Sequence, residues 1–364
     1  MSGEETLAAA TGGTDIGSVA TAFQPPAAGS PPGGAAQDLH VAAHWAQLAE
    51  DEHGDDSDSA IGPDNASSTE SMTPSILAYR TLHGRTYHSQ RGNAQYWASN
   101  DEPQNDHHFL LLLLDGKLFL APLKKDIQTV LDIGTGTGLW AIDFADEFPD
   151  ANVIGTDISP IQPSWVPPNL TFEIEDCTEE WTFKPDSVDF VHMRYLYGSI
   201  KDWAALFREA YRVCKPGGWV ESYEASPMME SDDGSVTEGS AMSKWGGFFI
   251  EGGRKLSRTF TVVDDDIQQT YMRDAGFVDI DVKNLKVPIG GWTQDAKLKE
   301  IGQYVQVALE ADYEGYVMYM AGLLGWTEEE VTVYCAQLRR EIRSRKYHPF
   351  YRQRVVWGRK PEGS

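Results

Sequence analysis

The sequence predicts an α/β fold in which a parallel sheet is covered by helices on both faces. Strand and helix patterns alternate through residues 127–225, the connections between them are short, and a glycine-rich segment, LDIGTGTG, follows the first strand. Such alternation is typical of βαβ units, whose crossover helices lie on both sides of the sheet. Three segments are expected to frame this core: a disordered acidic tail over residues 1–75, a helical cap over 76–126, and a substrate-side insertion with helices and last strands over 226–360.

The core elements follow from their residue patterns. TVLDI, ANVIGTDI, LTFEIEDC and VDFVHM are rich in β-branched and apolar residues, and we expect them to form the first four strands. GLWAIDFADEF and residues 202–214 carry apolar side chains at helical spacing. The PGG sequence at 216–218 is expected to end the second of these helices, and residues 219–223 to form a fifth strand.

The flanking segments have weaker patterns. In the cap, DHHFLLLLLDGKLFLAP is long and apolar enough for a buried helix, with Asp106 as its N-cap. Residues 226–262 lack a clear rhythm and are read as a mixed insertion. A helix and a strand are expected over 265–288, then helices to about Lys346 and a last strand at VVWGRK.

The N-terminal tail has the composition of a chain that cannot form a core. Residues 1–79 hold twelve acidic residues and no Lys or Arg, and segments such as QPPAAGSPPGGAAQ bury too little apolar surface to offset chain entropy. Two interpretations stay open: an unstructured solubilising tail, or a docking segment in which a short helix presents Trp45. The net charge of −25 repels phosphate backbones, so no direct nucleic-acid binding is expected.

The composition also indicates where the protein is located and whether it binds a metal. The longest apolar run is far shorter than the roughly 20 residues of a membrane span, and no secretory signal is recognised. The cysteines, Cys177, Cys214 and Cys335, form no CxxC pair, so neither a disulfide scaffold nor a zinc site is expected. His107 and His108 are adjacent and would point in different directions on a helix. We therefore expect no metal and a cytoplasmic or nuclear location.

The glycine-rich loop carries the strongest functional signal. Gly134, Gly136 and Gly138 allow a tight turn and a close approach of the backbone to a ligand. The spacing departs from the dinucleotide pattern GxGxxG, because Leu139 stands at the third glycine position. The GK[ST] ending of a P-loop is absent.

Three carboxylates end successive strands around this loop. Asp132 precedes the first glycine, Asp157 ends the second strand and Asp176 ends the third. The carboxyl ends of parallel strands meet at one edge of a sheet, where open α/β folds bind their ligands. Three carboxylates would repel a phosphate but suit a cationic nucleoside without phosphate.

These segments, taken in order, resemble the class I S-adenosylmethionine-dependent methyltransferases. LDIGTGTG is similar to the first motif of that family, VIGTDIS to the second, FEIEDC to the adenine-contacting third and CKPGGWVE to the segment before strand five. YWASNDEPQND, DFVHMRYLYGSIKDW and VVWGRKP further resemble the fungal LaeA-like methyltransferases, over roughly residues 79–360. The resemblance implies a Rossmann-like seven-stranded methyltransferase sheet and S-adenosylmethionine as cofactor.

The resemblance also implies which residues contact the cofactor. Asp132 and the three loop glycines would shape the pocket for its methionine end. Asp157 would hold the ribose, with Ile158 beside the adenine. Asp176 would accept a hydrogen bond from the adenine amino group, and the backbone of Cys177 would lie next to it.

Further contacts are implied at the two sides of the sulfonium. Met193, after the fourth strand, would close over it. In the cap, Tyr87 and Tyr96 with its neighbour Trp97 would cover the cofactor as a lid. For these aromatic residues the plain packing of the cap is an equal alternative.

The end of the fourth strand offers a candidate base. His192 has an ordinary pKa suited to proton transfer at neutral pH, and a base is needed only where the acceptor keeps its proton. The alternative is a structural histidine at a strand end. Arg194 either orients an acidic substrate or pairs with a local carboxylate.

Three functions remain open on this reading. The first is an enzyme that methylates O, N or S of a small metabolite, and the second is a regulatory methyltransferase in a nuclear protein complex. The third is a cofactor-binding subunit with little catalysis of its own. The basic segment at residues 339–346 of this chain is read as a solvated helix end, or as a nuclear import signal or partner contact. The methyl acceptor is thus a small molecule or a protein.

Overall fold

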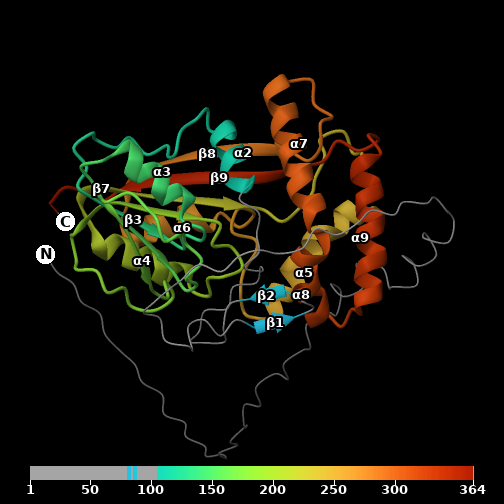
Figure 1. Cartoon of the computed structure of the whole chain (residues 1–364), viewed down its shortest axis with the longest axis horizontal. Coiled ribbons are helices and arrows are strands. Elements are labelled where there is room, and N and C mark those ends of the chain that lie inside the picture. Colours follow the sequence, from blue (N-terminus) through green and yellow to red (C-terminus); the bar gives the residue numbers. More distant parts are fainter. Residues whose placement is uncertain (1–79, 83–84, 88–104, 364) are drawn as a thin grey trace, which may run out of the picture.

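Seven strands form one mixed sheet in the order β5-β4-β3-β6-β7-β9-β8 in the computed structural model, which describes residues 80–82, 85–87 and 105–363 (Figure 1). The strands are β3 (Thr129–Ile133), β4 (Asn152–Asp157), β5 (Leu170–Ile174), β6 (Val188–Arg194), β7 (Cys214–Ala225), β8 (Val278–Pro288) and β9 (Phe350–Arg359). The first five are mutually parallel, whereas β9 runs antiparallel to both of its neighbours. The predicted seven-stranded Rossmann-like sheet is confirmed.

Helices cover both faces of this sheet and extend beyond one end of it. They are α2 (Asn105–Leu113), α3 (Leu139–Glu147), α4 (Trp203–Val213), α5 (Ala241–Lys255), α6 (Ile267–Ala275), α7 (Ala296–Ala311), α8 (Tyr313–Leu323) and α9 (Glu328–Arg343). Apolar residues of α4 and α6 form one buried cluster with the central strands, and α3 forms another. No helix of the described part is long and apolar enough to cross a membrane.

The parallel register brings the ends of the central strands together. Asp132 of β3 lies opposite Gly155 of β4 on one side and His192 of β6 on the other. Asp157 ends β4 beside Ile174, the last residue of β5. Strands β3 and β6 are mostly buried and largely apolar, and Asp132, His192 and Arg194 are polar residues near their carboxyl ends.

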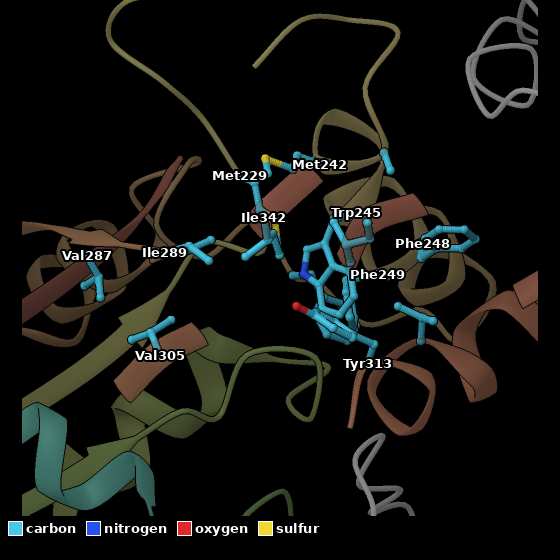
Figure 2. Close-up of a cluster of buried hydrophobic side chains, with 14 of the residues drawn as sticks. Met229, Met242, Trp245, Phe248, Phe249, Val287, Ile289, Val305, Tyr313 and Ile342 are labelled. Atoms are coloured by element: carbon cyan, nitrogen blue, oxygen red, sulfur yellow. The ribbon is translucent and has the colours of Figure 1, made fainter. Parts of the chain in front are cut away.

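The C-terminal helices form a second packing unit at the far end of the long strands (Figure 1). Helices α5, α7, α8 and α9 stand together there, and α2 lies against α7. Their core is the cluster of Figure 2, in which Trp245 and Phe249 of α5 lie near Tyr313 of α8. Helix α9 begins with a capping box between Thr327 and Glu330, which satisfies backbone donors of its first turn.

Two details of the N-terminal cap differ from the prediction. Arg80–Leu82 (β1) and Arg85–Tyr87 (β2) pair as antiparallel strands instead of continuing a helix. Helix α2 stops at Leu113, because Asp115 and Gly116 adopt left-handed backbone conformations with φ of 57° and 78°. The remaining apolar residues run as an irregular segment against the sheet, so the helix is shorter than its apolar pattern.

Other predictions fall outside the residues that the structure describes. These are the tail of residues 1–75 with Trp45, and the aromatic residues Tyr96 and Trp97 of the cap. The basic segment 339–346 lies at the end of α9, where Arg343 Nη2 pairs with Glu310 Oε2 of α7 at 2.6 Å.

Candidate functional site

The loop between β3 and α3 has the shape that its glycines predict. Gly134, Gly136 and Gly138 all adopt left-handed backbone conformations, with φ of 67°, 58° and 81°. Residues with a Cβ rarely take that conformation, and three within five residues fold the chain into a compact turn. The turn ends at Gly138, the N-cap of α3, where no side-chain hydrogen bond caps the first backbone N–H groups of the helix.

The three glycines differ in what surrounds them. A Cβ on Gly134 would come within 2.5 Å of Leu196 Cδ2, and one on Gly138 within 2.3 Å of Phe172 Cζ. A Cβ on Gly136 would meet no atom within 4 Å. The outer two glycines thus allow the loop to pack on the protein, whereas Gly136 borders open space in which a ligand can approach the backbone.

Asp132 braces this loop from below. It is only 3% exposed, and its Oδ2 accepts a hydrogen bond from Thr135 Oγ1 at 2.6 Å. Its Oδ1 lies 2.7 Å from Nδ1 of His192, which is 1% exposed. The His192 ring stacks on Trp140 with their centroids 3.7 Å apart and their planes within 3°. The loop therefore rests on a buried chain of polar contacts.

Asp157 links the loop to the end of β4. Its Oδ2 accepts a hydrogen bond from the Gly136 N–H and its Oδ1 one from the Ser159 N–H, each at 2.9 Å. Burial raises the pKa of this carboxyl to about 6, against the lowering effect of these backbone donors. Gln162 donates to the carbonyl oxygens of both Gly136 and Ser159, at 2.6 and 3.0 Å, and ties the two segments together.

The residues expected beside the adenine follow β4 and β5. Ile158 and Cys177 are both half-buried. Asp176 Oδ1 accepts hydrogen bonds from the backbone and the hydroxyl of Thr178, at 2.9 and 2.7 Å, and the Cys177 carbonyl accepts one from Trp181 Nε1 at 3.0 Å. These contacts hold the segment in place at the same sheet edge as Asp157.

Met193 and Tyr87 are two of the residues expected at the sides of the sulfonium. Met193 belongs to β6 itself and is fully buried in the core that the sheet forms with α4 and α6. Tyr87 ends β2, opposite Arg80. The lid that it was expected to form with Tyr96 remains a prediction.

The burial of His192 bears on its expected part as a base. Burial lowers the pKa of the imidazole, in opposition to Asp132, so the ring is neutral at neutral pH and donates from Nδ1 to the carboxylate. A general base must reach the proton that it removes, within hydrogen-bond distance or through one water. The ring is enclosed by Trp140 and Asp132, and it is connected to the glycine loop through Asp132.

Arg194, the last residue of β6, lies against the cap. Its Nη2 is 3.4 Å from Nδ1 of His107 on α2, and Nε2 of His107 is 2.8 Å from Asp143 Oδ2 on α3. Burial lowers the pKa of His107, with Arg194 acting in the same direction. This contact chain fixes α2 across the start of α3.

The segment after β6 connects the glycine loop to a pocket. Leu196 is the residue that approaches Gly134, and Tyr195 and Tyr197 on either side of it line the pocket. Glu224 of β7 holds this segment, because its two oxygens accept hydrogen bonds from the N–H groups of Leu196 and Tyr197 at 3.1 and 3.0 Å. Tyr195 adopts a left-handed backbone with φ of 57°, a strained state that is frequent at functional sites.

The pocket lies beyond the carboxyl ends of β6 and β7, between them and helices α2, α5, α7 and α8. Its empty volume is about 860 Å³, which includes space that is open to solvent. Aromatic and aliphatic side chains form most of its wall, including Met229, Trp245, Phe249, Ile289 and Val305 of Figure 2. Pockets with such a lining hold small organic molecules.

Comparisons with known proteins agree with this geometry. Residues 106–281 match a family described as a methyltransferase domain. The methyltransferase pytC of Aspergillus terreus is 36% identical over 82% of this chain and 93% of its own length. The chain belongs to the S-adenosylmethionine-dependent methyltransferases.

Other members of this group carry different names. The secondary metabolism regulator LAE1 of Cochliobolus heterostrophus is 31% identical over 77% of this chain and 94% of its own length. A solved structure of phosphoethanolamine N-methyltransferase 2 of Haemonchus contortus, with phosphomonomethylethanolamine and S-adenosylhomocysteine, is similar with a TM-score of 0.43 and 23% identity. That match covers 72% of this chain and 54% of the other.

The residues at the sheet edge of this methyltransferase fit its cofactor. The open space over Gly136 leaves room for a ligand against the loop backbone, and Asp157 stands beside it with lone pairs for hydroxyl donors. When bound, S-adenosylmethionine supplies an electrophilic methyl group on a sulfonium. We propose that Asp132, Gly134, Gly136 and Gly138 shape the methionine side, and that Asp157, Ile158, Asp176 and Cys177 form the nucleoside side.

Sequence reasoning missed several residues of this methyltransferase site. Gln162 lies in an irregular segment that gives no signal. Glu221 and Glu224 were detectable in principle, because two carboxylates inside an otherwise buried strand are costly unless paired. Their backbone partners come from residues 120–121 and 196–197, and such long-range pairs leave no local pattern.

Proposed function

We propose that this methyltransferase transfers a methyl group to a small, largely apolar metabolite. The observation that carries the proposal is the pocket beside the glycine loop. Segment 195–197 borders both, so a molecule in the pocket lies next to the expected methyl donor. A protein side chain would not require an apolar pocket of this kind. The names of its relatives associate the group with secondary metabolism, and we propose that the acceptor belongs to it.

Methyl transfer requires few reactive groups from the protein. A lone pair of the acceptor atom forms the new bond to the methyl carbon while the carbon–sulfur bond breaks, and any proton on the acceptor passes to solvent. Much of the rate of such a displacement comes from holding the reactants in line. We propose that the pocket wall and segment 195–197 do this, and that His192 acts through Asp132 rather than on the substrate.

A filled pocket tests the proposal. Ala308 of α7 lines the pocket and is 4% exposed, so Ala308→Phe would occupy the acceptor space. The purified protein is incubated with methyl-labelled S-adenosylmethionine and either the small-molecule or the protein fraction of a fungal extract. We expect label in the small-molecule fraction, at least about tenfold less of it with Ala308→Phe, and unchanged cofactor affinity.

The matched control is Ala311→Phe, at an exposed position of the same helix. It should label the small-molecule fraction like the wild type. Label found in the protein fraction alone would overturn the proposal. It would favour the second function, a regulatory methyltransferase, which the regulator names of relatives such as LAE1 support.

A further inference from the structure

A positive charge stands among the acids at the carboxyl edge of the sheet. Of the five residues that end the parallel strands, Arg194 of β6 is the one that is basic. Asp157 ends β4, and Asp132 lies one residue before the end of β3. Met193 lies opposite Ile133 in the register, so Arg194 follows at the level where the glycine loop begins.

The side chain of Arg194 shares a sheet face with that of His192, because alternate residues of a strand point to the same face. The ring of His192 stacks on Trp140 of α3, and Arg194 Nη2 lies 3.4 Å from Nδ1 of His107 on α2. Burial lowers the pKa of both histidines, and the charge of Arg194 acts in the same direction on each. The guanidinium therefore lies on the side of the sheet that α2 and α3 cover.

His107 holds this guanidinium in a defined orientation. Nε2 of His107 lies 2.8 Å from Asp143 Oδ2 and donates its hydrogen to that carboxylate. The neutral ring then has a lone pair at Nδ1, which accepts a hydrogen bond from Arg194 Nη2. The side chain of His107 is only 11% exposed, so the ring has little freedom to turn. The contacts from α3 through α2 to β6 thus fix one edge of the guanidinium.

Arg194 differs from other arginines of the chain in its partner. Arg212 and Arg352 pair with the carboxylates of Glu209 and Glu230, at 2.7 and 2.8 Å. Within the described residues Arg194 forms no such ion pair, and the imidazole that it contacts is neutral. A guanidinium has five N–H donors, and two of them can bind one carboxylate side by side. The half-buried Arg194 is therefore suited to bind an anionic group of a ligand.

The cofactor brings one anionic group to this edge. The methionine end of S-adenosylmethionine has a positive sulfonium, a positive α-ammonium and a negative α-carboxylate. The acids Asp132 and Asp157 favour the two positive groups and disfavour the carboxylate. Arg194 lies at the same edge and has the charge that the carboxylate requires.

We propose that Arg194 binds the α-carboxylate of S-adenosylmethionine and of S-adenosylhomocysteine, and that His107 is the positioning residue that orients the guanidinium. The inference rests on the proposed placement of the methionine end at the glycine loop, and it does not depend on the identity of the methyl acceptor. It gives Arg194 a partner other than the acidic substrate or the local carboxylate that the sequence left open.

Two ligands that differ in one carboxylate test this inference. S-adenosylhomocysteine carries the α-carboxylate, and its decarboxylated analogue keeps the adenosine, the thioether and the amine without it. Titration calorimetry measures the affinity of the full chain for each ligand, and no methyl transfer is needed. We expect S-adenosylhomocysteine to bind about tenfold to hundredfold more tightly, as hydrogen bonds between charged groups predict.

Variants of Arg194 separate its charge from the fold. Arg194→Gln should remove most of the preference for the carboxylate, and the affinity for the decarboxylated cation should stay equal or increase slightly. Arg194→Lys keeps the charge without the paired donors and should retain part of the preference. If Arg194→Gln does not fold, the wild type and Arg194→Lys still decide. Arg208→Gln, at an exposed arginine of α4, is the matched control and should change neither affinity.

A variant of His107 tests the positioning part. His107→Phe keeps an aromatic ring and removes the acceptor at Nδ1. If His107 orients Arg194, the ratio of the two affinities should decrease about threefold or more. If the ring only packs α2 against α3, both affinities should change together and the ratio should stay the same, which would overturn the positioning part.

Equal affinity of the wild type for the two ligands would overturn the inference. A preference that persists in Arg194→Gln would do the same, and would leave Arg194 for a carboxylate of the acceptor. Failure of the cofactor placement is distinguishable, because Gly136→Ala would then bind both ligands like the wild type. If only the assignment of Arg194 is wrong, Gly136→Ala weakens both ligands while Arg194→Gln keeps their ratio. Labelling of the small-molecule fraction tests the proposed acceptor separately.

Discussion

At the scale of single residues, the glycine loop separates packing from binding. Gly138 and Gly136 are two residues apart and share a left-handed backbone, yet one faces the Phe172 ring and the other open space. The sequence shows two equivalent glycines. Their surroundings predict that the same substitution reduces mainly the stability at Gly138 and mainly the ligand affinity at Gly136.

Alanine at each position tests this difference. Gly138→Ala should destabilise the fold by about 2–4 kcal/mol, because the new methyl overlaps Phe172 and the backbone is strained. Gly136→Ala should cost only the backbone strain, about 1–2 kcal/mol, but should weaken S-adenosylhomocysteine binding at least about tenfold. Thermal unfolding and titration calorimetry measure the two effects, and equal losses of stability would contradict the assignment.

His192, the candidate base of the sequence, is buried in the structure against Asp132 and Trp140. Its hydrogen bond to Asp132 and its stack on Trp140 predict that His192→Ala loosens the glycine loop. We expect weaker cofactor binding, by about fivefold to tenfold, and lower thermal stability. His192→Asn keeps a nitrogen donor near the position of Nδ1 and should recover most of the affinity.

The rate at saturating cofactor distinguishes positioning from proton transfer. If His192 acts through Asp132, single-turnover methylation by cofactor-saturated His192→Ala stays close to the wild-type rate. A general base would instead lose roughly 10²–10⁴-fold in that rate with little change in affinity. That second outcome would return His192 to the catalytic step.

At the scale of elements, one strand connects the two proposed ligand sites. Glu224 of β7 binds the backbone of segment 195–197, which faces the glycine loop through Leu196 and the pocket through Tyr195 and Tyr197. Glu221, three residues earlier, binds the N–H groups of Leu120 and Ala121 beneath the cap. The strand thus anchors both segments that overlie its end.

Glu224→Gln tests this connection. An amide has one acceptor oxygen in place of two, so one of the two backbone N–H groups loses its partner. We expect about a threefold to tenfold loss in cofactor affinity together with a raised KM for the acceptor. Glu173→Gln, at an exposed site on β5, is the control. A change in only one of the two constants would show that the segment does not couple the sites.

At the scale of the whole molecule, buried carboxyls make stability depend on pH. Burial raises the pKa of Glu221 to about 7 and that of Glu224 to about 8, from an ordinary value of 4.5. At a pH between 4.5 and the raised pKa of each carboxyl, the folded protein holds a proton that the unfolded chain has released. The free energy of unfolding therefore decreases as pH rises through this window.

Urea denaturation between about pH 6.5 and 8.5 measures this dependence. The wild type should lose up to about 1.4 kcal/mol of stability per pH unit from each carboxyl that is titrating. Glu221→Gln/Glu224→Gln should flatten the profile, because neither side chain titrates. This range lies above the pKa of about 6 of Asp157, so that group contributes little. Equal slopes for the two proteins would contradict the assignment.

The sequence by itself determined the α/β sheet, its strand positions, the glycine loop and the acids that surround it. These are local patterns: strand periodicity, glycines where φ is positive, and carboxylates at strand ends, all within about a hundred residues. The tertiary structure alone decided the rest. Whether His192 faces substrate or core depends on Trp140, and the pocket joins Tyr195 to Gln353, which are 158 residues apart in the chain. Burial and long-range contacts of this kind leave no periodic trace in a sequence, because they arise only when distant elements pack together.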